Sequence, residues 1–139
     1  MEEIFKKYPL LTDQNVPRET LIEFELFISM LKEENEKINI ISKKTTKNEI
    51  IRERHIVDSA QIIDFVDLNS NIITDIGSGG GMPGIIISII IKNQKNSAKI
   101  HLYEKSHHKS SFLRKVSRDL KLNTKIMQEN IFEAQNLES

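Results

Sequence analysis

The sequence contains no cysteine, so it forms no disulfide and offers no thiolate ligand to a metal. No apolar run approaches the roughly 20 residues that span a bilayer, since the longest extends only from Ile85 to Ile91. The opening stretch, MEEIFKKYPL, lacks the basic start and apolar centre of a secretory signal. We therefore expect a cytoplasmic protein of bacterial type with no membrane partner and no metal.

A charge surplus is absent as well, because 20 Lys and Arg residues balance 20 Asp and Glu residues. A protein that binds nucleic acid usually carries a basic surplus, so the net charge gives no support to such a partner. One local stretch differs, because a single acid, Asp119, accompanies a series of basic residues: Lys105, Lys109, Arg114, Lys115, Arg118 and Lys121. Two interpretations of this stretch stay open, a contact with RNA phosphates and a solvated helix face.

The length of 139 residues is typical of a single domain with one core. Two helices are expected first, one from Pro17 to about Asn35 and one from about Lys47 to Val66. Apolar residues recur at helical spacing in both: Leu21, Phe24, Ile28 and Leu31 in the first, and Ile56, Ala60 and Ile63 in the second.

Strand and helix patterns alternate after these helices. The runs IITDI, AKIHLYE and TKIMQ are short and apolar, as buried strands are, and the second ends at Glu104. HHKSSFLRKVSRDLKL has a helical face of Phe112, Leu113, Val116 and Leu120. The β-branched run IIISIII is ambiguous, and its position between two strands favours a buried crossover helix. This order predicts an α/β fold with a parallel sheet in residues 70–139, to which residues 1–69 add a helical extension within one domain.

All five glycines of the chain lie in the stretch DIGSGGGMPG, between Gly77 and Gly84. In a parallel α/β unit a ligand binds beyond the carboxyl ends of the strands, where the loop after the first strand brings its backbone close to the ligand. Side chains would obstruct that approach, which explains the spacing of Gly77, Gly79 and Gly81. Pro83 suits the first turn of the following helix, whose amino end favours negative groups.

Four interpretations of this loop differ in the residues that they require. A P-loop needs Gly-Lys followed by Ser or Thr, whereas this chain has MPG. The dinucleotide spacing GxGxxG occurs at Gly79, Gly81 and Gly84, but Pro83 interrupts it. An acid two residues before GxGxG, here Asp75, is the arrangement with which Rossmann-like methyltransferases hold S-adenosylmethionine. A glycine-rich turn without a ligand stays open as the fourth interpretation.

Residues after the second and third strands also fit that cofactor. A carboxylate at Glu104 would accept hydrogen bonds from both ribose hydroxyls, and the alternative is an ordinary exposed acid at a strand end. Asn130, Ile131, Phe132 and Glu133 follow the third strand and would lie near the adenine. Phe132 would pack on the adenine ring or, alternatively, serve as a core aromatic.

Four stretches carry a resemblance to a known family: NEKINIIS, RHIVDS, DIGSGGGMPGIIISI and FLRKVSRDLKL. With them the chain resembles the family of ribosomal RNA small subunit methyltransferase G, also called glucose-inhibited division protein B. The resemblance implies a Rossmann-like fold that uses S-adenosylmethionine to methylate guanine N7 of 16S ribosomal RNA in the small subunit. It implies cofactor contacts at Gly77, Met82, Phe132 and Glu133, with Glu104 at the ribose.

Candidate catalytic groups are few, in agreement with that chemistry. Guanine N7 has a free lone pair and no proton, so its methylation requires alignment and no general base. His55 has a catalytic interpretation, whereas its helical spacing to Asp58, together with Arg54, favours a structural cluster. His107 and His108 are expected at the surface.

The chain departs from the family because it ends at Ser139, just after the third strand. Family members continue with further strands and an arginine-bearing loop, so this chain resembles a version truncated after the third strand. Its open sheet edge would expose apolar surface. The alternatives to an active monomeric methyltransferase are a non-catalytic module that binds cofactor or RNA and, from another class, a nicotinamide-dependent oxidoreductase.

Overall fold

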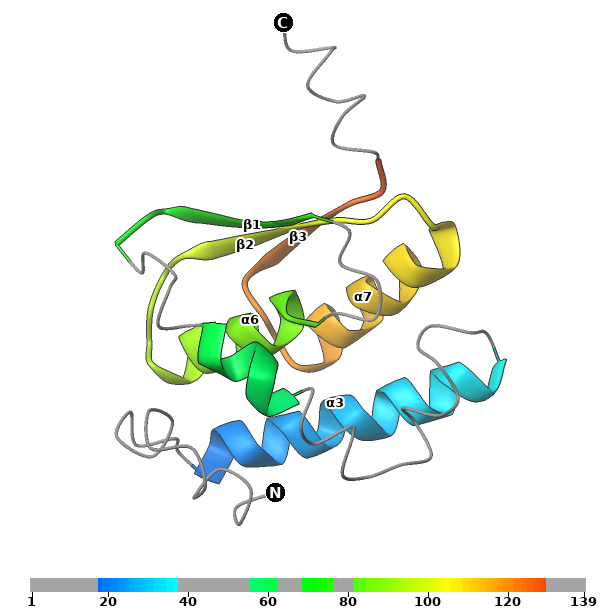
Figure 1. Cartoon of the computed structure of the whole chain (residues 1–139), viewed down its shortest axis with the longest axis horizontal. Helices are drawn as coiled ribbons and strands as arrows, with labels where there is room; N and C mark the ends of the chain where they lie inside the picture. Colours follow the sequence, from blue (N-terminus) through cyan, green and yellow to red (C-terminus); the bar gives the residue numbers. More distant parts are fainter. Residues whose placement is uncertain (1–17, 38–55, 63–68, 77–81, 130–139) are drawn as a thin grey trace, which may run out of the picture.

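The computed structural model describes residues 18–37, 56–62, 69–76 and 82–129. Residues 56–61 are helical, within the helix expected around them. The labelled elements in Figure 1 are α3 (Arg18–Lys37), β1 (Ile72–Ile76), α6 (Gly84–Asn93), β2 (Lys99–Tyr103), α7 (His107–Asp119) and β3 (Thr124–Met127). Every described element therefore lies where the sequence pattern predicts it.

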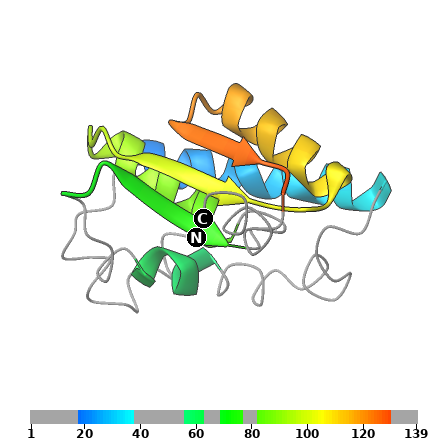
Figure 2. The same ribbon diagram turned by 90° about the horizontal axis from the view of Figure 1, so that it is seen from above.

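The three strands form a parallel sheet in the order β1-β2-β3. Ile76 of β1 is paired with Tyr103 of β2, and Tyr103 is paired with Met127 of β3. The α3, α6 and α7 helices all lie on one face of this sheet, as Figures 1 and 2 show from two directions. The predicted α/β fold with a parallel sheet is thus confirmed.

Helix α6 is buried on all sides, because every residue from Gly84 to Ile91 is buried. It lies between the sheet and α3 (Figure 1). A helix that is covered on two sides needs apolar residues around its whole circumference, which is why its sequence shows no helical periodicity. The ambiguous IIISIII run is therefore a crossover helix, as its position predicted.

Helix α3 closes the core from below the sheet. Of its predicted inward residues, Phe24, Ile28 and Leu31 are buried and Leu21 is partly buried. Phe27, which the periodicity did not single out, is buried as well. The ring of Phe27 lies 6.5 Å from that of Phe112 in α7, measured between centroids. One hydrophobic core therefore includes α3, α6, α7 and the sheet, while the predicted boundary between residues 69 and 70 stays a prediction.

Lys92 joins three helices through its ammonium group. The Nζ atom donates to Glu23 Oε2 of α3 at 2.6 Å and to the backbone oxygen of Leu120 at 2.8 Å, directly after α7. Because a helix end leaves carbonyl groups without intrahelical partners, the second bond satisfies one of them. Lys92 thus fixes the ends of α6 and α7 against α3.

Helices α6 and α7 end in the same backbone motif. Asn96 N donates to Ile91 O at 3.0 Å, and Leu122 N donates to Ser117 O at 2.9 Å, which closes each helix with a six-residue turn. The residue that adopts the left-handed conformation is Lys95 in the first turn (φ 57°) and Lys121 in the second (φ 53°). Glycine is the usual residue there, since a side chain in this conformation costs roughly 1–2 kcal/mol.

The second face of the sheet carries exposed apolar side chains. Ile72 is 53% exposed and Ile76 is 59% exposed, and both alternate with the inward-facing Ile73 and Asp75. Among the described strands, β1 pairs only with β2. Parallel sheets are normally covered on both faces, whereas α3, α6 and α7 all lie on the other face of this sheet.

We predict that Phe27→Ala lowers the free energy of unfolding by about 3–5 kcal/mol. The substitution removes a buried ring from the contact between α3 and α7. Urea denaturation checks this, with Ile22→Ala as the control, because Ile22 lies in the same helix and is 50% exposed. Equal effects of the two substitutions would contradict the role of Phe27 in the core.

Candidate cofactor site at the carboxyl ends of the strands

The carboxyl ends of the three strands meet at one edge of the sheet, on the right in Figure 1. Of the predicted cofactor contacts, Met82 and Glu104 lie among the described residues. The others lie outside them and stay predictions: Gly77, Gly79, Gly81, Ile131, Phe132 and Glu133. The described part of the site therefore consists of the ends of β1 and β2 and the helices that follow them.

The end of β1 is bonded to the start of α6. Asp75 Oδ2 accepts a hydrogen bond from Gly84 N at 3.1 Å, and a Cβ atom at Gly84 would collide with the side chains of Leu102 and Asp75. Gly84 is thus required for close packing of helix on strand. Close packing thus explains the glycine at position 84 without a ligand. Pro83 stands at the N-cap, one position before the first turn expected for it.

Glu104 is held in a fixed position at the carboxyl end of β2. Its side chain is buried with the residue only 7% exposed, so the interpretation as an ordinary exposed acid is wrong. Glu104 Oε1 accepts from Ser106 N at 3.1 Å, and the backbone oxygen of Glu104 accepts from Ser110 Oγ at 2.8 Å. The sequence pattern did not single out these two serines, which orient the turn into α7.

The amino end of α7 lies at the same edge of the sheet. Ser106 is its N-cap and accepts from Lys109 N at 3.4 Å, and the first turn contains no acid. His107 and His108 are exposed, as expected, and His107 Nδ1 lies 3.4 Å from Gln128 Oε1 just after β3. The helix therefore presents the positive end of its dipole at this edge.

Met82 precedes α6 and is half-buried, with its side chain packed against the hydrophobic core. On the second face of the sheet, Ile76, Tyr103 and Met127 form one row across the carboxyl ends of the strands. The site thus combines a fixed carboxylate and a helix amino end with nearby apolar side chains, which are the groups that a nucleoside with charged substituents requires.

Asp58 is exposed in the helical residues 56–61. Arg54 and His55 lie outside the described residues, so the predicted cluster of these three side chains stays a prediction. In the described part of the chain, no group of three or more His, Cys, Asp or Glu residues is arranged to hold a metal ion. No helix in that part is long and apolar enough to cross a bilayer.

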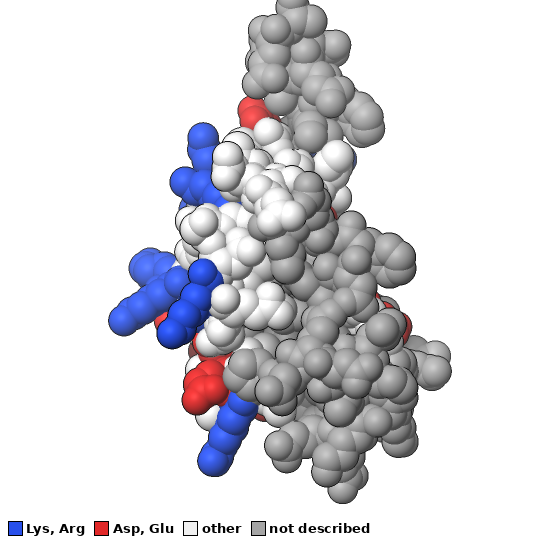
Figure 3. All heavy atoms as spheres, turned by 90° about the vertical axis from the view of Figure 1, so that its left-hand side faces the viewer, with Lys and Arg blue, Asp and Glu red and all other residues white. Residues whose placement is uncertain are grey.

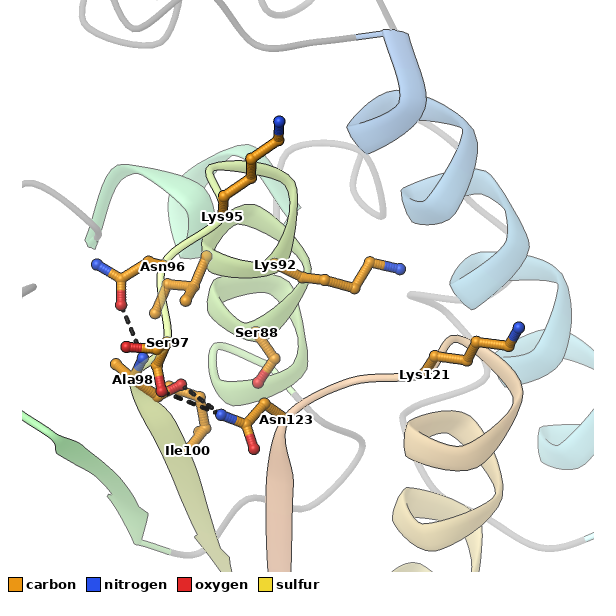
Figure 4. Close-up of a pocket in the computed structure, with 10 residues that line it drawn as sticks. Ser88, Lys92, Lys95, Asn96, Ser97, Ala98, Ile100, Lys121 and Asn123 are labelled. Carbon is orange, nitrogen blue, oxygen red and sulfur yellow. Dashed lines mark hydrogen bonds between the residues drawn. The ribbon is translucent and has the colours of Figure 1, made fainter.

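A hollow of about 260 Å³ lies at the other end of the sheet. It is bordered by the turns that lead into β2 and β3, where Asn123 Nδ2 donates to the backbone oxygens of Ser97 and Ala98 at 3.2 Å (Figure 4). Its apolar lining includes Ile91 and Ile100. Since ligands of open α/β sheets bind beyond the carboxyl ends, this hollow is not the predicted cofactor site.

His101 lies between two lysines on the second face of the sheet. Burial lowers its pKa below the usual value, and the positive charges of Lys125 and Lys99 lower it further. Lys125 is paired with His101 across the β2–β3 ladder, and Lys99 precedes it by two residues on the same face. Two lysine side chains therefore lie beside His101 on this part of the sheet.

A family model described as rRNA small subunit methyltransferase G matches residues 20–139. The chain is 88% identical over all of its 139 residues to Ribosomal RNA small subunit methyltransferase G of Pelagibacter ubique (strain HTCC1062), and covers 65% of that protein.

Two further relatives carry the same name. One, from Rickettsia rickettsii (strain Sheila Smith), is 37% identical over 84% of this chain and 57% of the relative. The other, from Ruegeria sp. (strain TM1040), is 39% identical over 76% of this chain and 50% of the relative. The chain thus spans between 50% and 65% of the length of these relatives.

We predict that Gly84→Ala destabilises the protein by about 1–3 kcal/mol, because the added methyl group forces α6 away from Leu102 and Asp75. Urea denaturation measures the change. The opposite effect is expected if helix propensity dominates, since alanine is favoured over glycine in a helix by about 1 kcal/mol. A stabilised variant would therefore contradict the close packing at this position.

Proposed function

The chain belongs to the family of rRNA small subunit methyltransferase G, and we propose that it binds S-adenosylmethionine and methylates guanine N7 of 16S ribosomal RNA. Family membership supports the reaction class. The chain covers 65% of the relative from Pelagibacter ubique, so the activity of the whole protein is part of the proposal. The proposal includes a cytoplasmic monomer that acts on the small ribosomal subunit.

The position of Glu104 is the observation that carries the proposal. A carboxylate directly after the second strand of a parallel sheet is suited to accept hydrogen bonds from ribose hydroxyls. Here Ser106 N holds Glu104 Oε1 at 3.1 Å and the residue is 7% exposed, so the carboxylate has one orientation. A fixed acceptor binds a ribose with little loss of side-chain entropy.

The start of α6 is suited to the end of S-adenosylmethionine that carries its carboxylate. The hydrogen bond between Asp75 and Gly84 holds the start of α6 at the end of β1. The first turn of α6 contains no acid. A helix amino end of this kind favours a carboxylate. Gly77, Gly79 and Gly81 would bring bare backbone to the ligand beside it, and Met82, Ile131, Phe132 and Glu133 would line the nucleoside.

The chemistry needs positioning and little proton transfer. When bound, S-adenosylmethionine supplies a methyl group attached to a positively charged sulfur. Guanine N7 carries no proton, so the residues of this chain have to hold the reacting groups in line and exclude water, without a general base. The proposal therefore assigns no catalytic acid or base, and no metal.

We predict that Glu104→Gln raises the Kd for S-adenosylmethionine roughly tenfold or more, since hydrogen bonds to charged groups contribute about 1.5–3 kcal/mol. The new amide oxygen can still accept from Ser106 N, so the turn into α7 should remain intact. Calorimetric titration measures the Kd. Glu25→Gln is the matched control, because Glu25 is an exposed carboxylate in α3. An unchanged Kd in Glu104→Gln would remove Glu104 from the site.

Transfer of labelled methyl groups to 30S subunits that lack the modification tests the reaction. The proposal expects transfer that depends on S-adenosylmethionine and stops at one methyl group per subunit. A folded protein that binds the cofactor without transfer would support the non-catalytic module instead. Binding of NAD in place of S-adenosylmethionine would support the oxidoreductase.

A further inference from the structure

Four exposed lysines gather at the amino ends of the strands, opposite the candidate cofactor site. Lys95 and Lys121 lie in the turns after α6 and α7, Lys99 begins β2, and Lys125 lies near the start of β3. Figure 3 views the molecule from the left-hand side of Figure 1 and shows Lys and Arg side chains projecting from this end. We refer to these four residues as the amino-end lysines.

Two of the described acids near this end are paired with other cations. Glu23 binds Lys92 at 2.6 Å, and Asp119 Oδ1 lies 3.3 Å from Nε of Arg118. The amino-end lysines therefore add positive charge that these two acids do not balance. Lys99 and Lys125 also lie on the same face of the sheet as His101, one on each side of it along β2 and across the β2–β3 ladder.

Lys95 and Lys121 also share an uncommon backbone conformation. Both residues occupy left-handed positions where glycine would be unstrained. At the end of α7, the carbonyl of Leu120 already receives a hydrogen bond from Lys92, so Lys121 is not needed to satisfy it. Strain that is retained at two equivalent turns is better explained by a use for the side chains.

We propose that the amino-end lysines bind phosphates of the ribosomal RNA substrate and form a contact surface separate from the methyl-transfer site. The identity of the RNA rests on the proposed function. β2 has five residues, which at about 3.3 Å each put roughly 16 Å between this surface and Glu104. A substrate as large as a ribosomal subunit spans both ends of the sheet.

The direction of the side chains indicates how the RNA would lie. In Figure 4 the ammonium groups of Lys95 and Lys121 point away from the hollow that their turns border. The phosphates would therefore contact the outer surface and would not enter the hollow. Contacts of this kind position the substrate and read no base sequence.

The test uses the double variant Lys95→Gly/Lys121→Gly and a fluorescent 16S RNA transcript as the probe. Anisotropy titrations should show affinity reduced roughly fivefold per lysine at 0.1 M salt, with a salt slope smaller by about 1 per lysine. The Tm should stay equal or rise, because glycine relieves the left-handed strain. Unchanged affinity and salt slope would overturn the proposal.

Two controls separate charge from backbone effects. Lys95→Arg/Lys121→Arg keeps both charges and should bind the transcript like the original protein. Lys37→Gly removes one exposed lysine from the far end of α3 and should leave the affinity unchanged. Equal losses in Lys37→Gly and in the single variants Lys95→Gly and Lys121→Gly would show a general charge effect and overturn the assigned surface.

The methyl-transfer assay distinguishes failure of this inference from failure of the proposed function. If the original protein methylates 30S subunits, the double glycine variant should raise KM for the subunits and keep kcat, since Glu104 lies at the other end of the sheet. An unchanged KM, or a fall in kcat alone, would overturn the inference. If the original protein transfers no methyl group, the proposed reaction fails, and the anisotropy titrations still decide whether the surface binds RNA.

Discussion

Burial of α6 on two sides is the constraint on which the remaining structure depends. An isoleucine-rich helix that lay only on the sheet would leave half of its side chains in water, at a cost of about 25 cal/mol for each Å² of apolar surface. Helix α3 removes that surface through Phe24, Phe27 and Leu31. The N-terminal helix is therefore part of the core of the α/β unit, although it precedes the first strand by many residues.

The position of α6 in turn fixes the geometry of the candidate site. Asp75 and Gly84 are nine positions apart in the sequence and are joined by a 3.1 Å hydrogen bond. The loop between them thus leaves and returns at the same corner of the sheet. Glu104 is fixed at the neighbouring corner by Ser106 and by the bond from its own nitrogen to Met127 O. Hydrogen bonds thus fix the ends of two neighbouring strands, and a cofactor site needs residues that are held rigidly in this way.

The two ends of the sheet differ in charge and in the way that they are stabilised. At the carboxyl ends, side-chain hydrogen bonds hold a carboxylate next to helix amino ends. At the amino ends, Lys92 ties the helices together, while Lys95 and Lys121 stay exposed on left-handed backbone. In the proposed arrangement, one end holds the small cofactor and the other contacts the large RNA, so the two ligands do not compete for the same surface.

The sequence by itself determined the order of the elements, because periodicity records which side of a helix or strand faces the core. It also located the glycine loop and Glu104 at the ends of strands. It favoured a helix for IIISIII without settling it, and it left open whether Glu104 is exposed and why Gly84 is a glycine. Only the tertiary structure decided them, because each depends on a neighbour that is distant in the sequence: α3 for the isoleucines, the turn into α7 for Glu104, and Leu102 with Asp75 for Gly84.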